Sequence, residues 1–324
     1  MKNFLFYTAT VLIWGSTWIG IKFQLGVVEP MVSVGYRFAL AALLLMLWCH
    51  FRRLPMRFTS TQHLFIAMQG TFLFAVNYLL FYIAELYVAS GLAAVIFSTI
   101  LLMNMVNGAI FLRSPIDMKV VCGGILGLAG IVLVFRPEIA TFTIDNHGLR
   151  GVLFCIAATY LASLGNILSA RNQKNALPVV QTNAYGMGYG ALLMLGFALI
   201  AGKNMQIDTS FAYLGSLAYL AVFGSIIAFG CYLTLIGNIG ADRAAYSTLL
   251  FPIVALVIST IWENYQWSSS SICGVTLILS GNLLMLQRKK MAKTTDTTNL
   301  TTRNETVHKE GISCKREPLR NPAK

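Results

Sequence analysis

The fold is decided by a stretch that occurs twice: residues 91–100 read GLAAVIFSTI, and residues 240–249 read GADRAAYSTL. Each stretch begins with glycine, is mostly apolar and carries a Ser-Thr pair near its end. Further residues recur in the same order along the two halves of the chain. They are Gly124-Ile125-Leu126-Gly127 with Gly130 against Gly274-Val275-Thr276-Leu277 with Gly281, and Pro30 against Pro178. The sequence therefore predicts an internal repeat.

The composition places this repeat in a membrane. Hydrophobic residues make up 56% of the chain and charged residues 11%, whereas a soluble domain has about 25% charged residues. A helix needs about 20 apolar residues to cross a hydrocarbon core of ~30 Å. Ten stretches meet this requirement: 4–22, 31–50, 63–84, 86–111, 118–135, 149–168, 178–201, 210–236, 242–262 and 270–287. They lack the polar face of a soluble helical bundle and the alternating polarity of a membrane β-barrel.

Five spans in each half is an odd number, so the two halves are expected to cross the membrane in opposite directions. Inverted repeats of this kind are common in secondary transporters, with the substrate site between the halves. We predict an all-α integral membrane protein with ten transmembrane helices in a 5+5 inverted-topology repeat. The first repeat is expected at 1–140, the second at 146–290 and a tail at 291–324. Nine or eleven spans is the alternative, because only Glu85 and its neighbours separate the third and fourth stretches.

Basic residues between the spans predict the orientation. With a cytoplasmic N-terminus, nine lie inside and four outside. The inside set is Lys2, Arg52, Arg53, Arg57, Arg113, Lys119, Arg171, Lys174 and Arg243; the outside set is Lys22, Arg136, Arg150 and Lys203. Lys2 and the run after it superficially fit a signal peptide, but no convincing A-x-A cleavage site follows. We expect a multi-pass protein of the cell inner (plasma) membrane with both termini in the cytoplasm.

The tail is basic and polar. Residues 288–324 carry ten Lys or Arg and four Asp or Glu, a net +6 out of the chain's +12. Because this segment has almost nothing to bury, we expect disorder and a role in setting topology. Contact with anionic lipid is the alternative.

Several functional classes lack the residues they need. The overall charge makes no case for nucleic-acid binding, since half of it lies in the tail. The run Gly196–Asn204 lacks the spacing and the Ser/Thr of a P-loop, and the four histidines lie at span ends or outside the spans. We therefore expect that the protein is not an enzyme and that it has no cofactor and no metal site. The expected partners are a small-molecule substrate, the lipid bilayer and a coupled proton or other ion, and the oligomeric state is left open.

Polar and aromatic residues inside the spans are candidates for lining a substrate cavity, because polar groups are costly in hydrocarbon. The candidates are Trp14, Trp18, Asn77, Tyr78, Tyr82, Ser98, Asn104, Tyr160, Asn166, Tyr232, Tyr246 and Ser247. Such a lining offers aromatic faces and hydrogen bonds with little fixed charge, which suits zwitterionic or amphiphilic molecules. The alternative for each polar residue is that it holds neighbouring membrane helices together.

Charged and glycine residues inside the spans have other expected roles. Arg37 lies about 10 Å along its helix from Pro30. Binding of a carboxylate or phosphate is one role for it, and snorkelling or helix pairing is the favoured one. Glu85 is expected near a membrane interface, with proton coupling as the alternative. The small-xxx-small spacing of glycines such as Gly123 with Gly127 and Gly186 with Gly190 predicts close helix packing.

The opening of the chain also resembles a known family. Trp14-Gly15-Ser16-Thr17-Trp18 followed by Lys22, and then Pro30 and Arg37, are similar to the EamA-type members of the drug/metabolite transporter superfamily. Further matches are Ala89-Ser90-Gly91-Leu92-Ala93-Ala94 and the glycine-rich fifth and tenth spans ending at Arg136-Pro137 and Gln287-Arg288. The resemblance covers roughly residues 4–290. It implies ten helices in a 5+5 inverted repeat, cytoplasmic termini, carriage of small metabolites, commonly outward, and a cavity lined by spans one, three, four, six, eight and nine.

The first half departs from the family pattern in two places. The proline that follows the Ser-Thr pair is kept as Pro252 in the second half but is replaced by Leu101-Leu102-Met103 in the first. The Gly-Glu that usually closes this span is Arg113-Ser114, whereas the second half ends with Glu263. These changes concern the gating of the first half rather than the architecture.

The sequence predicts a secondary transporter that exports amino acids or related small metabolites by alternating access. Efflux of toxic aromatic or cationic drugs is the first alternative, followed by a metabolite exchanger or importer. A channel is less favoured, because nothing resembles a selectivity filter or a ring of charges. Cation efflux would favour an acidic residue deep in the cavity, and the sequence offers no convincing one.

Overall fold

The computed structural model describes residues 2–24, 28–84, 86–88, 90–140, 146–262 and 267–286. Over these residues the regular secondary structure is helical. The elements are α1 Lys2–Lys22, α2 Pro30–Phe51, α3 Ser60–Gly70, η1 Thr71–Val76, α4 Asn77–Ala84, α5 Ser90–Ser98, α6 Ile100–Leu112, α7 Met118–Val134, α8 Arg136–Ala140, α9 Asn146–Lys174, α10 Val179–Ile200, α11 Phe211–Tyr219, η2 Leu220–Ile227, α12 Ala228–Ile239, α13 Ala241–Ala244, α14 Tyr246–Trp262 and α15 Ser269–Leu286. The predicted tail, Glu85 and Glu263 lie outside the described residues.

The helices follow the predicted apolar stretches. Seven helical stretches are long and apolar enough to cross a membrane, and α7 and α15 are shorter apolar helices. Two predicted bounds are wrong. The fourth stretch begins at Ser90 rather than Leu86, because residues 86–88 form a turn in which Val88 N–H donates to the Ala84 carbonyl. Helix α9 runs on past Leu168 to Lys174, because its polar residues there are buried against other helices.

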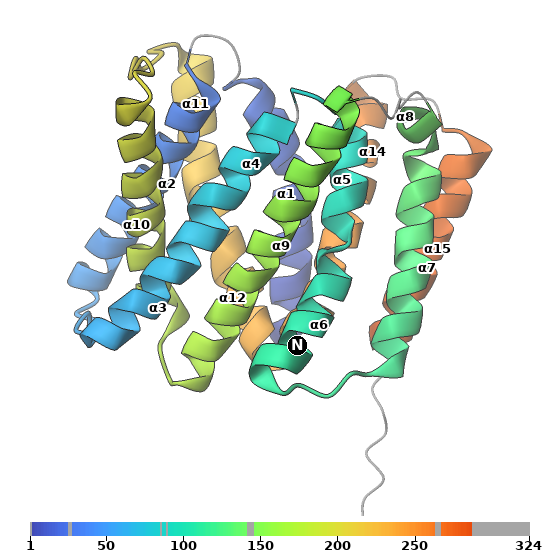
Figure 1. Ribbon diagram of the computed structural model, residues 1–324, viewed down its shortest axis with the longest axis horizontal. Helices are drawn as coiled ribbons and strands as arrows, with labels where there is room; N and C mark the ends of the chain where they lie inside the picture. Colours follow the sequence, from blue (N-terminus) through green and yellow to red (C-terminus); the bar gives the residue numbers. More distant parts are fainter. Residues whose placement is uncertain are drawn as a thin grey trace, which may run out of the picture. The chain divides into compact units, whose positions relative to one another are not determined.

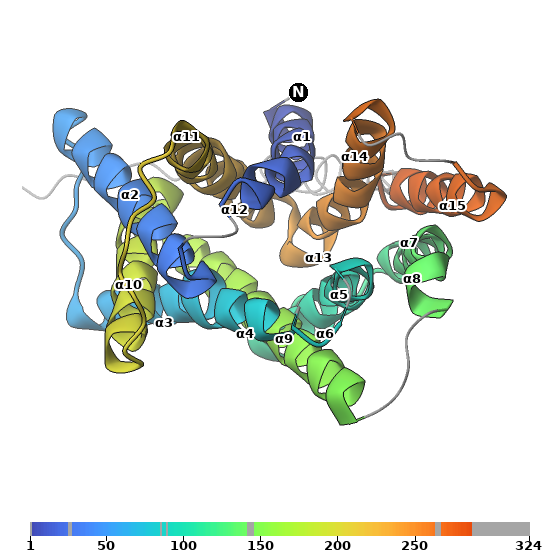
Figure 2. The same cartoon turned by 90° about the horizontal axis from the view of Figure 1, so that it is seen from above.

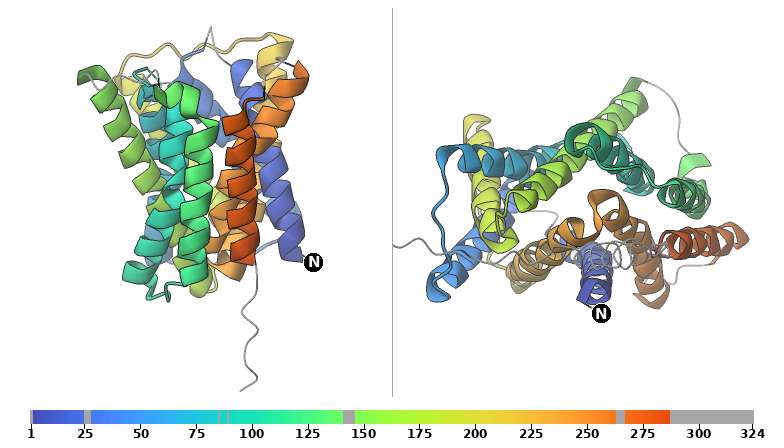
Figure 3. Two further views of the ribbon diagram at one scale, coloured as in Figure 1. Left: turned by 90° about the vertical axis from the view of Figure 1, so that its right-hand side faces the viewer. Right: turned by 90° about the horizontal axis from the view of Figure 1, so that it is seen from below.

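The helices form two facing layers (Figures 1 and 2). Figure 2 shows α1, α12 and α14 on one side and α4, α9 and α5 with α6 on the other. At the two ends of these layers, α2 packs against α10 and α7 packs against α15. The left view of Figure 3 shows the second of these pairs side by side. Residues from the first and second halves of the chain therefore meet along the whole middle of the molecule.

Glycine allows α7 and α15 to touch. A Cβ atom on Gly130 would lie 2.5 Å from the carbonyl oxygen of Gly274, and one on Gly281 would lie 2.5 Å from the carbonyl oxygen of Gly123. No side chain fits at such distances, so the two backbones are in direct contact, as in small-xxx-small interfaces. The predicted close packing of Gly123 with Gly127 and of Gly186 with Gly190 is confirmed, because a Cβ atom on Gly127 would meet Leu249, one on Gly190 would meet Phe74, and one on Gly70 would meet the Gly186 backbone.

A widened turn occurs at the corresponding place in each half. The π-helix η1 lies between α3 and α4, and the π-helix η2 lies between α11 and α12. A π-helical turn accommodates an extra residue and is common at functional sites. The π-helix η1 packs against α9 and α10, and η2 packs against α1 and α2.

The repeated Ser-Thr pair forms the same tight turn twice. The backbone N–H of Thr99 donates to the carbonyl of Ile96 at 3.0 Å, and that of Thr248 donates to the carbonyl of Ala245 at 3.0 Å. Each threonine hydroxyl donates to the same carbonyl at 2.6 Å. The stretch that recurs in the sequence therefore recurs as a local hydrogen-bonded turn, although the helix is interrupted at Thr99 in the first half and at Ala245, three residues before Thr248, in the second.

The two ends of the molecule differ in charge. The connections α2–α3, α6–α7 and α9–α10 lie at the lower end in Figure 1, together with the N-terminus, whereas α7–α8 and α10–α11 lie at the upper end. The basic residues next to these lower connections are Arg52, Arg53, Arg57, Arg113, Lys119, Arg171 and Lys174. The basic residues that the sequence assigned to one side of the membrane thus lie at one end of the fold.

Candidate functional site

The indole of Trp14 in α1 packs against three aromatic rings of the second half. The ring centroid of Trp14 lies 4.8 Å from that of Phe229, 5.0 Å from that of Tyr232 and 5.2 Å from that of Phe251. These separations are those of attractive edge-to-face and tilted pairs. Its Nε1–H donates to the carbonyl oxygen of Gly224 in η2 at 3.0 Å. Trp14 therefore joins α1 to η2, α12 and α14 while staying partly exposed.

Arg37 in α2 reaches the same π-helix. Its side chain is only 5% exposed, and its Nε–H donates to the hydroxyl oxygen of Ser225 at 2.8 Å. The guanidinium carbon lies 5.4 Å from the ring centroid of Phe38 and 5.7 Å from that of Tyr78. The side chain does not snorkel to a membrane surface, because its charged group is held between α2, α4 and η2.

A network of polar side chains joins the two layers. The Nδ2 group of Asn166 in α9 lies 3.1 Å from the hydroxyl oxygen of Tyr232 and 3.4 Å from Oδ1 of Asn104. Asn104 in α6 donates in turn to the carbonyl oxygen of Ala241 at 3.0 Å. Asn104, Asn166 and Tyr232 are at most 2% exposed. The network therefore connects α6, α9, α12 and α13, and Tyr232 links it to the ring of Trp14.

Two buried amide oxygens in this region have no hydrogen-bond partner among the described residues. They are Oδ1 of Asn77, in α4 directly after η1, and Oδ1 of Asn166. Leaving a buried acceptor unpaired costs about 1–3 kcal/mol, and such groups in native proteins call for an explanation such as a ligand or a water molecule. Both oxygens are therefore able to accept a hydrogen bond from a bound molecule.

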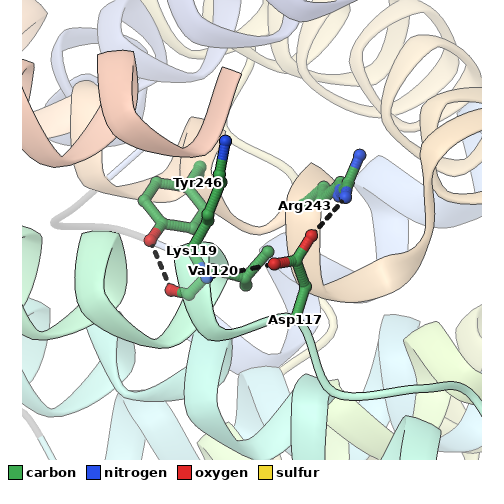
Figure 4. Close-up of polar contacts among 5 residues, drawn as sticks. All are labelled: Asp117, Lys119, Val120, Arg243 and Tyr246. Carbon is green, nitrogen blue, oxygen red and sulfur yellow. Dashed lines mark hydrogen bonds and ion pairs between the residues drawn. The ribbon is translucent and has the colours of Figure 1, made fainter. Parts of the chain in front are cut away.

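At the lower end, a second set of contacts fastens the two halves together (Figure 4). Arg243 in α13 forms an ion pair with Asp117, with 2.7 Å between Nη2 and Oδ2. The other carboxylate oxygen of Asp117 accepts from the backbone N–H of Lys119 at 3.0 Å and caps α7. The hydroxyl of Tyr246 in α14 donates to the carbonyl of Val120 at 2.7 Å. We call the four residues Asp117, Val120, Arg243 and Tyr246 the lower-end contact.

A separate hollow of about 500 Å³ lies at the lower end between α2 and α10. Its lining residues are Met46, Cys49, His50, Arg53, Leu54, Met56 and Tyr185. None of the cavity residues predicted from the sequence lines it. Among the described residues, no group of His, Cys, Asp or Glu has the arrangement needed to hold a metal ion.

Comparison with known proteins identifies the family. The model of the EamA-like transporter family matches residues 1–136 and 149–287. The chain belongs to the EamA-like transporter family. This confirms the resemblance drawn from the residues around Trp14, Pro30 and Arg37. The chain is a multi-pass membrane protein of a transporter family, not an enzyme.

Three relatives are similar over most of their length. Protein PagO of Salmonella typhimurium is 23% identical over 87% of this chain and 92% of its own. The inner membrane transporter YedA of Escherichia coli K12 is 28% identical over 78% of this chain and 80% of its own. A Salmonella typhimurium protein named "Probable amino-acid metabolite efflux pump" is 23% identical over 84% of this chain and 90% of its own. A crystal structure matches with a TM-score of 0.73 at 16% identity, covering 94% of this chain and 98% of that chain, and it supports the fold alone.

Within this EamA-like fold, five of the predicted residues come together. Trp14, Asn104, Asn166 and Tyr232 are joined by direct contacts, and Tyr78 packs over Arg37. Asn77 is buried and precedes Tyr78 in α4. The side chains of Trp18 and Tyr82 lie outside the described residues.

Four predicted residues lie elsewhere. The hydroxyls of Ser98 and Ser247 donate to carbonyls of their own helices, those of Ala94 and Ala244. Tyr246 belongs to the lower-end contact. Tyr160 in α9 is 43% exposed, since it precedes Asn166 by six residues and a helix that turns about 100° per residue places the two some 120° apart.

The sequence analysis missed several residues of this region. Phe229 and Phe251 form the wall around Trp14, and Phe74 contacts Phe229 with 4.9 Å between ring centroids. Phenylalanine in an apolar span carries no signal that separates a cavity wall from ordinary packing. Ser225 was detectable in principle, as a polar residue inside the apolar run that surrounds it.

Proposed function

We propose that the chain is a secondary transporter that exports small metabolites such as amino acids or related compounds. It would act by alternating access, through ten transmembrane helices in a 5+5 inverted-topology repeat, in the cell inner membrane with both termini in the cytoplasm. Family membership supports transport, and one relative carries the name of an amino-acid metabolite efflux pump. The paired π-helices and the paired tight turns support two structurally equivalent halves.

The observation that carries the proposal is the contact chain from Arg37 to Asn104. It runs through Ser225 and Gly224 in η2, Trp14, Tyr232 and Asn166, and it crosses between the two facing layers. A ligand site in a membrane protein needs aromatic or apolar walls with a few oriented polar groups. Polar side chains inside membrane spans are expensive and mark substrate pathways by default. This chain of contacts has both properties, and the proposal is further supported by the general rule that inverted-repeat transporters bind their substrates between the two halves.

In the proposed transport cycle, the lower-end contact is formed in the state that is closed toward the cytoplasm. Asp117 and Val120 belong to the first half, and Arg243 and Tyr246 belong to the second. While these groups are paired, the start of α7 is held against α13 and α14, and the Ala241 carbonyl of α13 accepts from Asn104. Access from the basic, cytoplasmic end requires this contact to open. The described conformation is therefore the one closed toward the cytoplasm in our proposal.

Efflux of aromatic compounds remains the second candidate, because four aromatic rings surround the centre of the site. Cationic compounds are less favoured. Arg37 places a buried positive charge beside the aromatic cluster, and like charges in a medium of low dielectric constant repel strongly. An aromatic substrate of this chain is therefore expected to be neutral, zwitterionic or anionic.

Uptake and counterflow in proteoliposomes test the proposal. The panel contains labelled amino acids, nucleotides and organic cations, with imposed proton and sodium gradients in separate experiments. A saturable and competable signal for amino acids or related metabolites is expected. In Trp14→Ala this signal should fall by about tenfold or more, since aromatic anchors are worth about 1–3 kcal/mol.

Tyr160→Ala is the matched control, because it removes an aromatic ring of similar size that lies away from the site and is 43% exposed. It should transport like the parent protein. Equal transport by the parent and Trp14→Ala would contradict the assigned site. Flux that fails to saturate and shows no counterflow would favour a channel over a carrier.

A further inference from the structure

Arg37 is a buried cation that has no counter-ion among the described residues. Its side chain is 5% exposed, and no carboxylate among the described residues forms an ion pair with it. The two described ion pairs, Lys203 with Glu29 and Arg243 with Asp117, are elsewhere. Burying an unpaired charge costs several kcal/mol even after relaxation. A fold that carries such a charge gains stability whenever an anion enters beside it.

The protein fixes the orientation of this guanidinium. Nε–H donates to the hydroxyl oxygen of Ser225 at 2.8 Å, and the Ser225 hydroxyl donates to the carbonyl of Leu220 at 3.0 Å. The hydroxyl is therefore committed as an acceptor to Arg37. The rings of Phe38 and Tyr78 lie beside the guanidinium at 5.4 and 5.7 Å. The two terminal Nη groups accordingly remain as the donors that can receive a ligand.

The shape of the remaining donors selects the anion. The two Nη groups of a guanidinium form a planar fork that matches the two oxygens of a carboxylate. The absence of a side chain on Gly224 lets Arg37 and Thr17 pack closely against η2, since a Cβ atom there would lie 3.1 Å from Nη2 of Arg37 and 3.0 Å from the methyl group of Thr17. Of the 24 Lys and Arg residues of the chain, the others lie near helix ends, in connections or in the tail. A single buried positive charge suits a monoanion.

We propose that Arg37 binds the carboxylate group of the transported molecule, with Phe38, Tyr78 and Trp14 contacting its apolar part. The inference rests on the proposed function and names the substrate class as small monocarboxylates, amino acids included. The unpaired Oδ1 of Asn77, next to Tyr78 in sequence, is an acceptor of the kind that an ammonium or amide group of such a molecule would need. Arg37 is thereby a specificity residue for transport as well as a link between α2 and η2.

A purely structural role for Arg37 makes different predictions. If Arg37 only holds α2 against η2, removing its hydrogen bond to Ser225 should have the same effect as removing its charge. If Arg37 binds the substrate carboxylate, loss of the charge should act on molecules that carry a carboxylate and spare those that do not. Variants and substrates can therefore be combined to separate the two roles.

The experiment compares amino acids with their amides, which keep the side chain and ammonium group but lack the carboxylate charge. The pairs are leucine with leucinamide, phenylalanine with phenylalaninamide and threonine with threoninamide, assayed by counterflow and by thermal unfolding of the purified full-length protein. In the parent protein the acids should be carried about tenfold to a hundredfold better than the amides, since hydrogen bonds to charged groups are worth about 1.5–3 kcal/mol. In Arg37→Gln the acids should fall to the level of the amides.

Three control variants define the outcome. Ser225→Ala removes the hydrogen bond within the fold and should keep the preference for acids over amides. Arg37→Lys keeps the charge without the fork and should keep part of the preference. Arg150→Gln removes an exposed arginine of α9 and should behave like the parent. If Arg37→Gln does not fold, Arg37→Lys and Ser225→Ala still decide between the two roles.

Three results would overturn the inference without touching the proposed function. The first is equal transport of acids and amides by the parent protein. The second is a preference for acids in Arg37→Gln as strong as in the parent. The third is a loss of preference in Ser225→Ala as complete as in Arg37→Gln. Absence of transport and of thermal stabilisation for every acid and every amide would instead overturn the proposed export of amino acids together with this inference.

Discussion

Neutralising Asp117 should open the lower end of the molecule. Asp117 both pairs with Arg243 at 2.7 Å and caps α7 by accepting from the N–H of Lys119 at 3.0 Å. Asparagine is as good a helix N-cap as aspartate, so Asp117→Asn removes the charge while keeping the cap. The two side chains are 18% and 38% exposed, respectively. The pair is therefore partly screened by solvent, and we take its contribution near the upper end of the range for exposed pairs, about 1 kcal/mol.

The expected change in the population of open molecules follows from this energy. A loss of about 1 kcal/mol from the closed state changes the ratio of open to closed molecules by about fivefold. Tyr246→Phe removes the hydrogen bond to the carbonyl of Val120 and should contribute a further factor of about fivefold. The two sites are neighbours, so the combined variant is not expected to be strictly additive.

The labelling rate of a buried cysteine measures this opening. Ala244→Cys places a thiol next to Arg243 at a position that is fully buried; it is made in a chain whose native cysteines are replaced. A membrane-impermeant maleimide is added from the cytoplasmic side. Asp117→Asn should raise the labelling rate by about fivefold. Glu29→Gln, which breaks the ion pair between Glu29 and Lys203 at the other end, is the matched control and should leave the rate unchanged.

A double-mutant cycle shows whether the ion pair is responsible. Asp117→Asn with Arg243→Gln should label no faster than the faster of the two single variants, because the pair can be broken only once. Unchanged labelling in Asp117→Asn, or fully additive effects in the double variant, would refute the assignment of this ion pair as a contact that closes the cytoplasmic end.

Three further predictions concern packing, the polar network and topology. Gly274→Val should lower the stability in detergent by about 1–3 kcal/mol, because its side chain would meet the Gly130 backbone. Gly196→Val is the control and should change the stability little, because there is open space around Gly196. Equal melting temperatures of the two variants would argue against the α7–α15 contact. Asn166→Leu should fold but transport about tenfold less well, since it removes the hydrogen bond to Tyr232 and the buried unpaired acceptor Oδ1. Transport at the parental rate would make Asn166 a packing residue. A fluorescent protein fused at the C-terminus should fluoresce and alkaline phosphatase fused there should be inactive, and active phosphatase would refute a cytoplasmic C-terminus.

The candidate site was only partly predictable. Asn104, Asn166, Tyr232 and Trp14 stood out as polar or aromatic residues inside apolar spans, and they meet in the structure. Tyr160 satisfied the same criterion and lies 43% exposed. The criterion depends on residue type alone, and it cannot distinguish the side of a helix that faces the opposite layer from the side that faces outward.

The role of Arg37 was also not predictable from the sequence alone. The sequence placed it about 10 Å along its helix, which is compatible with snorkelling, helix pairing or anion binding. Only its contact with Ser225, 188 residues later, removed the first of these. That contact depends on η2, and a π-helix shifts the phase of every side chain after it relative to a regular α-helix.

The sequence by itself determined the membrane class, the positions of the apolar helices to within a few residues, the charge difference between the two ends and the duplicated Ser-Thr turn. These features depend on composition, on the length of apolar runs and on short-range hydrogen bonds, all of which are local along the chain. The tertiary structure decided which side chains meet: Arg37 with Ser225, Trp14 with Tyr232, and Asp117 with Arg243. The reason is physical, because the partners lie on different helices and their meeting depends on how each helix is rotated, where it is widened and how closely glycine lets its neighbours approach.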